Sequence, residues 1–152
     1  METRRFEASW PSLTVAERWV ADACRNLALP GDAAYALQAS CEELSTNVVR
    51  HGDRQKDQPP GDDDLWFELA INRTHAIVTL TISDNTAAFD TAAAIAAAGR
   101  TAGPDFQIGG LGLTLIKSLA AAVSYRRHDG QNETRLDFRL SEEGPTVEEK
   151  PA

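Results

Sequence analysis

Three polar residues of the segment CEELSTNVVRHG are spaced four apart: Glu43, Asn47 and His51. On a helix this spacing places their side chains on one side, one turn above another. A carboxylate can accept a proton from a hydroxyl group, and an amide oxygen is a hard ligand suited to Mg²⁺. The ridge could therefore serve a phosphate-bearing ligand. The same spacing is common on solvated helix faces, so the pattern alone leaves both interpretations open.

A second candidate is the carboxylate of Asp84, in the segment Ser83, Asp84 and Asn85 that follows an alternating apolar run. We expect this carboxylate at the end of a strand, directed into the crevice there. It could accept a hydrogen bond from an amino group such as that of adenine. The alternative is a turn residue that bonds its own backbone, as Asp and Asn commonly do.

The third candidate is the glycine-rich segment IGGLGL at residues 108–113. It opens a predicted helix, whose N-terminus offers free backbone N–H groups and a positive dipole end to an anion such as a polyphosphate. Glycines before a helix can also serve only a tight turn. The segment is not a Walker A motif, because GK[ST] does not follow, and not a Rossmann fingerprint, because GxGxxG after a first strand is lacking.

Two helices are predicted ahead of these motifs. The first follows a strand over 4–10, begins at the capping-box spacing of Thr14 and Glu17, and ends before Pro30. The second extends from residue 33 to about residue 50, carries the polar ridge, and stops at His51 and Gly52, where glycine suits a left-handed cap. Their apolar stripes are Val15, Trp19, Ala23 and Leu27 in the first helix, and Leu37, Cys41, Leu44 and Val48 in the second.

The remaining elements indicate a sheet. Alternation predicts strands over 65–72 and 78–82, then 123–127 and 134–140, the last two joined by a turn at Asp129 and Gly130. A solvated loop is expected over 53–64, and a mobile flap over 86–109 with a short helix near 92–98; a further helix is expected over 112–123. Tight connections between neighbouring strands predict an α+β fold of two layers, with a largely antiparallel sheet and helices on one face.

The composition limits the functions that the chain can have. Its 152 residues, 42% of them hydrophobic, predict one domain over 1–140, followed by an acidic, disordered tail over 141–152. The charge of −8 argues against direct nucleic-acid binding. The lack of a long apolar run argues against a membrane partner and favours a cytoplasmic protein. Cys24 and Cys41 are too far apart for a CxxC site and are expected as buried, reduced thiols.

The three motifs, taken in order, resemble those of the ATP-binding fold shared by gyrase, the ninety-kilodalton heat-shock chaperone, histidine kinases and MutL. CEELSTNVVRHG resembles the N box of that superfamily, SDNTAAFD its first glycine box and IGGLGLTLIKSL its second. The short chain and the final YRRHDGQNETRLDFRL are similar to the RsbW and SpoIIAB type of anti-sigma factor serine kinase. The resemblance covers roughly residues 5–140.

This resemblance implies a Bergerat-type two-layer sandwich with a mobile ATP lid, and it implies a role for each motif residue. Glu43 would be the general base for a substrate serine, Asn47 the Mg²⁺ ligand, and Asp84 the acceptor of the adenine amino group. His51 would lie near the nucleotide. The phosphate-binding amides would be those of Gly109, Gly110, Leu111, Gly112 and Leu113, and Thr134 would contact the adenine region through water. ATP and Mg²⁺ are thus the implied cofactors.

The implied function is a cytoplasmic switch kinase. It would hold a sigma factor or an equivalent target inactive, and phosphorylate a serine of a STAS-type anti-anti-sigma antagonist. The family resemblance also implies a homodimer.

Two departures from the motifs keep alternatives open. Thr86 occupies a glycine position of the first glycine box, and Gln107 and Ile108 stand where SpoIIAB-like chains have an arginine, the nearest one here being Arg100. A non-catalytic module that acts only by sequestration is therefore the main alternative. A detached histidine-kinase ATPase domain is disfavoured, because no histidine precedes the predicted N-box helix. The last alternative is an ordinary α+β domain with three accidental motifs.

Overall fold

The computed structural model describes residues 1–53, 64–99 and 109–141, with backbone alone for 109–111. The expected tail beyond Ser141, most of the predicted loop over 53–64 and the segment 100–108 of the predicted flap lie outside these residues. Within the described ranges, no helix combines the length and the apolar composition that crossing a bilayer requires.

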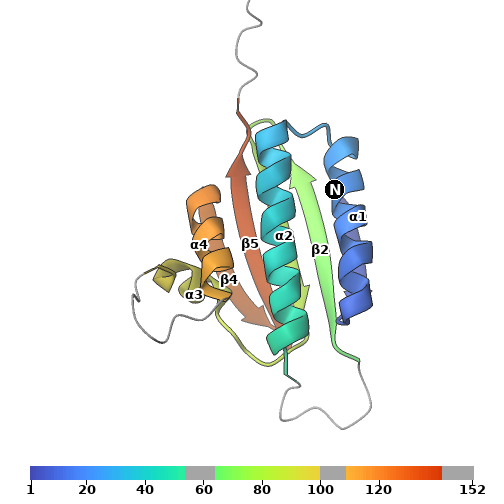
Figure 1. Ribbon diagram of the computed structural model, residues 1–152, viewed down its shortest axis with the longest axis vertical. Coiled ribbons are helices and arrows are strands. Elements are labelled where there is room, and N and C mark those ends of the chain that lie inside the picture. The colour runs from blue at the N-terminus through green and yellow to red at the C-terminus, as the bar shows by residue number, and fades with distance from the viewer. Residues whose placement is uncertain (54–63, 100–108, 142–152) are drawn as a thin grey trace, which may run out of the picture.

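After a first strand, pairs of helices and pairs of strands follow one another along the chain (Figure 1). In chain order they are β1 (Glu2–Glu7), α1 (Trp10–Asn26), α2 (Gly31–His51), β2 (Trp66–Arg73), β3 (Ile77–Asp84), α3 (Thr91–Ala97), α4 (Gly109–Leu119), β4 (Ala122–His128) and β5 (Gln131–Arg139).

The strands form one sheet in the order β1-β2-β3-β5-β4, and every neighbouring pair is antiparallel. The helices α1, α2 and α4 cover one face of this sheet, with α2 between the other two, while α3 lies beside α4 (Figure 1). The prediction of a two-layer α+β fold with helices on one face is confirmed.

The core lies between these two layers. Alternate residues of the strands are fully buried against the helices, because successive strand side chains point to opposite faces. From α2, Leu37, Cys41 and Leu44 fill the same space, as their spacing predicted. Burying each large apolar side chain stabilises the fold by about 1.5–3 kcal/mol. The strand residues of this core are Phe67, Leu69, Ile71, Val78, Leu80, Ile82, Leu136 and Phe138.

The predicted start of the first helix was wrong. Helix α1 begins at Trp10 with a proline in its first turn, where a fixed φ and a missing N–H cost nothing. Thr14 and Glu17 therefore lie inside the helix and form no capping box, and β1 ends at Glu7. Of the predicted apolar stripe, Ala23 is buried and Trp19 and Leu27 pack against the core, but Val15 is 45% exposed. The other buried residues of α1 are Ala16, Val20 and Cys24.

Helix α2 ends at His51, as predicted, and begins two residues earlier than expected. Gly52 does not adopt the predicted left-handed conformation, since its φ is −68°. A glycine is needed there for space instead. A Cβ at this position would lie 2.3 Å from the carbonyl oxygen of Val48 and 2.6 Å from Cγ2 of Thr86. The close approach of α2 to the segment after β3 thus requires a residue without a side chain.

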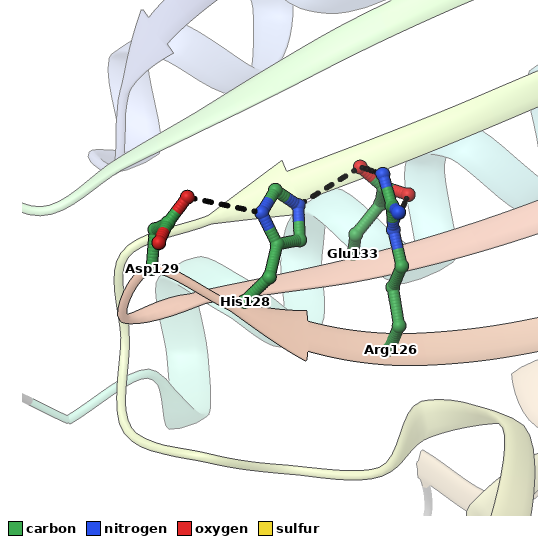
Figure 2. A network of polar contacts seen from close by, with 4 residues as sticks. All are labelled: Arg126, His128, Asp129 and Glu133. Carbon is green, nitrogen blue, oxygen red and sulfur yellow. Dashed lines mark hydrogen bonds and ion pairs between the residues drawn. The ribbon is translucent and has the colours of Figure 1, made fainter.

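Strands β4 and β5 form a hairpin with a turn at Asp129 and Gly130, whose φ angles of 50° and 73° confirm the predicted turn. The open face of this hairpin carries a polar network in which Arg126 binds Glu133, and His128 lies between Glu133 and Asp129 (Figure 2). The alternate residues of both strands face the helices. This alternation directs part of β5 toward the site described next.

Candidate functional site

A pocket of about 570 Å³ opens between α2, α3, the start of α4, the end of β3 and the start of β5. Its apolar wall includes Leu44, Val48 and Ile82. The pocket brings together residues that come from all three sequence motifs and from the last strand. Five of the predicted site residues line it: Asn47, His51, Asp84, Leu113 and Thr134.

Asp84 lies at the last position of β3 and is 8% exposed. Its Oδ1 accepts hydrogen bonds from Thr86 N at 3.0 Å, Thr86 Oγ1 at 2.5 Å and Asn132 Nδ2 at 2.9 Å. In the described ranges, no residue donates a hydrogen bond to Oδ2. The alternative that Asp84 is a turn residue is therefore correct in part, because its carboxylate accepts a hydrogen bond from the backbone N–H two residues later, that of Thr86. That bond occupies one oxygen only.

Thr86 lies beside Asp84 and is 5% exposed. Its hydroxyl group is bound to Asp84, and its methyl group lies in the space that a Cβ on Gly52 would need. The Thr86 side chain, which replaces a glycine of the first glycine box, is thus fixed between Asp84 and Gly52. The absence of a side chain at Gly52 makes room for this arrangement.

Asn132 is a buried residue of the site that the sequence analysis missed. Its Nδ2 donates to Asp84 Oδ1 at 2.9 Å and to the carbonyl oxygen of Ala87 at 3.0 Å. Its Oδ1 accepts from Tyr125 Oη at 2.6 Å, Arg127 Nη1 at 2.9 Å and Phe89 N at 3.2 Å. Asn132 stands two residues before Thr134 in β5, so both side chains lie on the same face of the strand. This position was the only signal in the sequence. The strand register, in which it stands opposite the last residue of β3, was not predictable.

Glu43 does not line this pocket. Its side chain contributes to a neighbouring groove of about 600 Å³ that α1, α2 and α4 border. A Cβ on Gly112 would lie 1.9 Å from Glu43 Oε2 and 2.2 Å from its Cδ. The Glu43 carboxylate therefore rests directly on the backbone of α4, next to the second glycine box. The polar ridge of α2 is divided between the groove, which has Glu43, and the pocket, which has Asn47 and His51.

The glycine segment lies inside α4, which begins at Gly109 and not at the predicted Gly112. Its first turn consists of Gly109, Gly110, Leu111 and Gly112. The N–H groups of a first helical turn have no partner within the helix, so they can bind an anion. Helix α4 ends at Leu119, earlier than predicted, because β4 already begins at Ala122.

The fit of the site to Mg²⁺ depends on Asn47. Within the described ranges, no three His, Cys, Asp or Glu residues are grouped as a metal site. Protein sites for nucleotide-bound Mg²⁺ commonly use only one or two protein oxygens, with phosphates and water as the other ligands. A single amide oxygen at the pocket wall fits that arrangement and does not fit an all-protein metal cage.

Both cysteines are buried and free, as predicted. Burial raises the pKa of the Cys41 thiol to about 12, and burial also raises the pKa of Cys24. Neither is activated as a nucleophile or a metal ligand.

Residues 6–138 match the family described as the histidine kinase-like ATPase domain. The chain belongs to this family. The resemblance seen in the motifs is thereby confirmed, and with it the histidine kinase-like ATPase fold. This ATPase domain is 32% identical over 102 residues to the serine/threonine-protein kinase BtrW of Bordetella bronchiseptica strain RB50. That alignment covers 67% of this chain and 68% of BtrW.

Two solved structures align with this ATPase domain at low identity. The SiaB-SiaC complex from Pseudomonas aeruginosa has a TM-score of 0.47 and 17% identity, and covers 92% of this chain and 90% of its own. The nucleotide-free catalytic domain of the histidine kinase ThkA has a TM-score of 0.46 and 10% identity, and covers 92% and 98%.

Proposed function

We propose that this histidine kinase-like ATPase domain is an ATP-dependent serine kinase of the anti-sigma type, acting in the cytoplasm. Family membership supports ATP as the cofactor, and the relationship to BtrW supports a protein serine or threonine as the phosphate acceptor. The observation that carries the proposal is Asp84, which lines a pocket with apolar walls and whose Oδ1 accepts three hydrogen bonds from protein donors, while no residue of the described ranges donates to Oδ2.

In this proposal the pocket binds the nucleotide. Asp84 Oδ2 accepts a hydrogen bond from the adenine amino group, and Thr134 contacts the same region through water. Asn47 holds Mg²⁺ on the phosphates, and His51 lies close to the nucleotide at the end of α2. The phosphates bind the backbone N–H groups at the start of α4, from Gly109, Gly110, Leu111, Gly112 and Leu113.

Glu43 is the proposed general base. It would accept the proton of the substrate serine hydroxyl as the serine oxygen bonds to the γ-phosphorus and the bond from that phosphorus to the bridging oxygen of ADP breaks. Its contact with Gly112 supports this role, because it places the carboxylate beside the helix start that would hold the phosphates. The adjoining groove gives a protein substrate access to the same carboxylate.

The partners complete the proposal. A sigma factor would be held inactive, a STAS-type antagonist would receive the phosphate, and the kinase would be a homodimer. The net charge of −8 is compatible with a basic surface on the sequestered target and would raise the rate of encounter.

The first test is calorimetric titration of the protein with ATP, with and without Mg²⁺, on wild type and Asp84→Asn. We expect Mg²⁺-dependent binding that the substitution weakens. Wild-type protein that does not bind ATP would refute the proposal.

The second test is transfer from γ-labelled ATP to the serine of a purified STAS-domain protein encoded in the same genome, with Glu43→Gln as the matched control. Glu43→Gln should bind ATP normally and transfer no phosphate. ATP binding and antagonist binding without transfer by wild type would favour the non-catalytic sequestering module, for which Thr86 in the pocket wall is the supporting observation.

A further inference from the structure

One buried amide connects three parts of the site. Asn132, on β5, is 3% exposed and bonds to Asp84 at the end of β3, to the segment that follows β3, and to two side chains of β4. We infer that Asn132 is a positioning residue that orients the Asp84 carboxylate and thereby determines which nucleobase the pocket accepts. This inference rests on the proposed function, since it concerns the same pocket.

The chemistry of its partners determines the orientation of the Asn132 amide. On the Nδ2 side lie the Asp84 carboxylate and the Ala87 carbonyl, which can only accept hydrogen bonds. On the Oδ1 side lie the Arg127 guanidinium and the Phe89 N–H, which can only donate. If the amide were flipped, its oxygen would face two acceptors and its NH₂ group would face two donors. Asn132 therefore donates to Asp84 in this fold.

This donation completes the set of hydrogen bonds at one oxygen of Asp84. Thr86 N, Thr86 Oγ1 and Asn132 Nδ2 approach Oδ1 from two different segments of the chain, so the carboxylate cannot rotate without losing bonds to one of them. Oδ2 is left as an acceptor. A ligand group that meets it must be a donor, such as the exocyclic amine of adenine.

The same geometry rejects a base that presents an acceptor. The keto oxygen of hypoxanthine occupies the position of the adenine amine, and it would leave Asp84 Oδ2 unpaired and in repulsion. A site built to hydrogen-bond one group discriminates strongly against an analogue that lacks it, because its own buried polar group stays unsatisfied. If Asn132 no longer holds the carboxylate, Asp84 can turn, and this discrimination should weaken.

The test compares the Mg²⁺-dependent dissociation constants of ATP and inosine triphosphate by calorimetry. Wild type should prefer ATP at least tenfold. Asn132→Ala should weaken ATP binding about tenfold and inosine triphosphate binding less than about threefold, so that the preference falls. A merely structural role would weaken the binding of both nucleotides by the same factor, and that result would overturn the inference.

A second variant, Asn132→Asp, is nearly isosteric and guards against a failure of Asn132→Ala to fold. It keeps an oxygen for Tyr125, Arg127 and Phe89, and replaces by an acceptor the group that donates to Asp84 and to the carbonyl oxygen of Ala87. Two carboxylates in contact share a proton at low pH, so the bridge to Asp84 should re-form there. We expect the ATP preference of this variant to be lost at pH 8 and to recover toward pH 5, while that of wild type changes less than threefold. A variant with the wild-type preference at both pH values would contradict the inference.

Glu133→Gln is the matched control. Glu133 adjoins Asn132 in β5 but points to the opposite face, where it binds Arg126 (Figure 2). Its substitution should leave the ratio of the two dissociation constants unchanged. Wild-type protein that binds no ATP refutes the proposed function and this inference together. ATP binding whose preference does not respond to either Asn132 variant refutes the inference alone.

Discussion

The contact between Gly112 and Glu43 makes a sharp prediction about catalysis. In Gly112→Ala, the new Cβ would lie 1.9 Å from Oε2, 2.2 Å from Cδ and 2.8 Å from Cγ of Glu43. Ordinary van der Waals contact begins near 3.4 Å, so the carboxylate must move by about 3.4 − 1.9 = 1.5 Å. The Glu43 side chain is flexible and at the edge of a groove, so it can move at little cost to folding.

The displacement should affect transfer and not nucleotide binding. A misplacement of about 1 Å can cost a factor of about 100 in rate, which corresponds to about 2.7 kcal/mol of activation free energy. Alanine keeps its backbone N–H, so the dissociation constant for ATP should change less than about threefold. Within a helix, alanine is favoured over glycine by about 0.5–1 kcal/mol, so the free energy of unfolding should not fall.

The assay is single-turnover transfer from labelled ATP, with the dissociation constant for ATP and urea unfolding measured on the same samples. Gly31→Ala is the matched control, because a Cβ there meets nothing within 4 Å. A Gly112→Ala variant that transfers at the wild-type rate would refute the reasoning.

Three further predictions concern stability. Gly52→Ala should lower the free energy of unfolding by about 1–3 kcal/mol in urea titration, and Thr86→Ser, which removes only the clashing methyl group, should restore part of it. No recovery in the double variant would exclude the Thr86 contact as a cause. Cys41, whose pKa of about 12 in the folded state lies above the ordinary 9.0, favours the folded state while protonated. Its contribution is therefore complete below pH 9 and falls by up to about 1.4 kcal/mol per pH unit above it. Cys41→Ala should make the loss of stability between pH 8.5 and 10 shallower, and an unchanged slope would contradict this origin. The hydrogen bond from Arg126 lowers the pKa of the Glu133 carboxyl below its ordinary value of 4.5. The ion pair therefore stabilises the folded state above pH 4.5, and this contribution is lost as the pH falls through the lowered pKa. Glu133→Gln should cost less than about 1 kcal/mol at pH 7, and this cost should shrink as the pH falls below 4.5; a cost that stays constant as the pH falls would rule out the ion pair.

The boundaries predicted from the sequence were most reliable where a periodic pattern met a strong local signal. The end of α2 at His51 and the turn at Asp129 were predicted correctly, because both depend on neighbouring residues. The start of α1 was missed, since the Thr14 spacing imitated a capping box while a proline near Trp10 had already begun the helix. For Gly52 the residue type was noted but its reason was misjudged, because the contact that requires it comes from across the pocket.

The sequence by itself determined the α+β class, the buried faces of α2 and the strands, and the order of the three motifs. Each follows from side-chain periodicity or from neighbouring residues, and such local patterns survive without knowledge of the fold. Only the tertiary structure decided that Asn132 stands opposite Asp84, and that Glu43 rests on Gly112. These contacts depend on strand register and on the packing of one helix against another. No local spacing encodes them, because the residues that meet are separated by 48 and 69 positions.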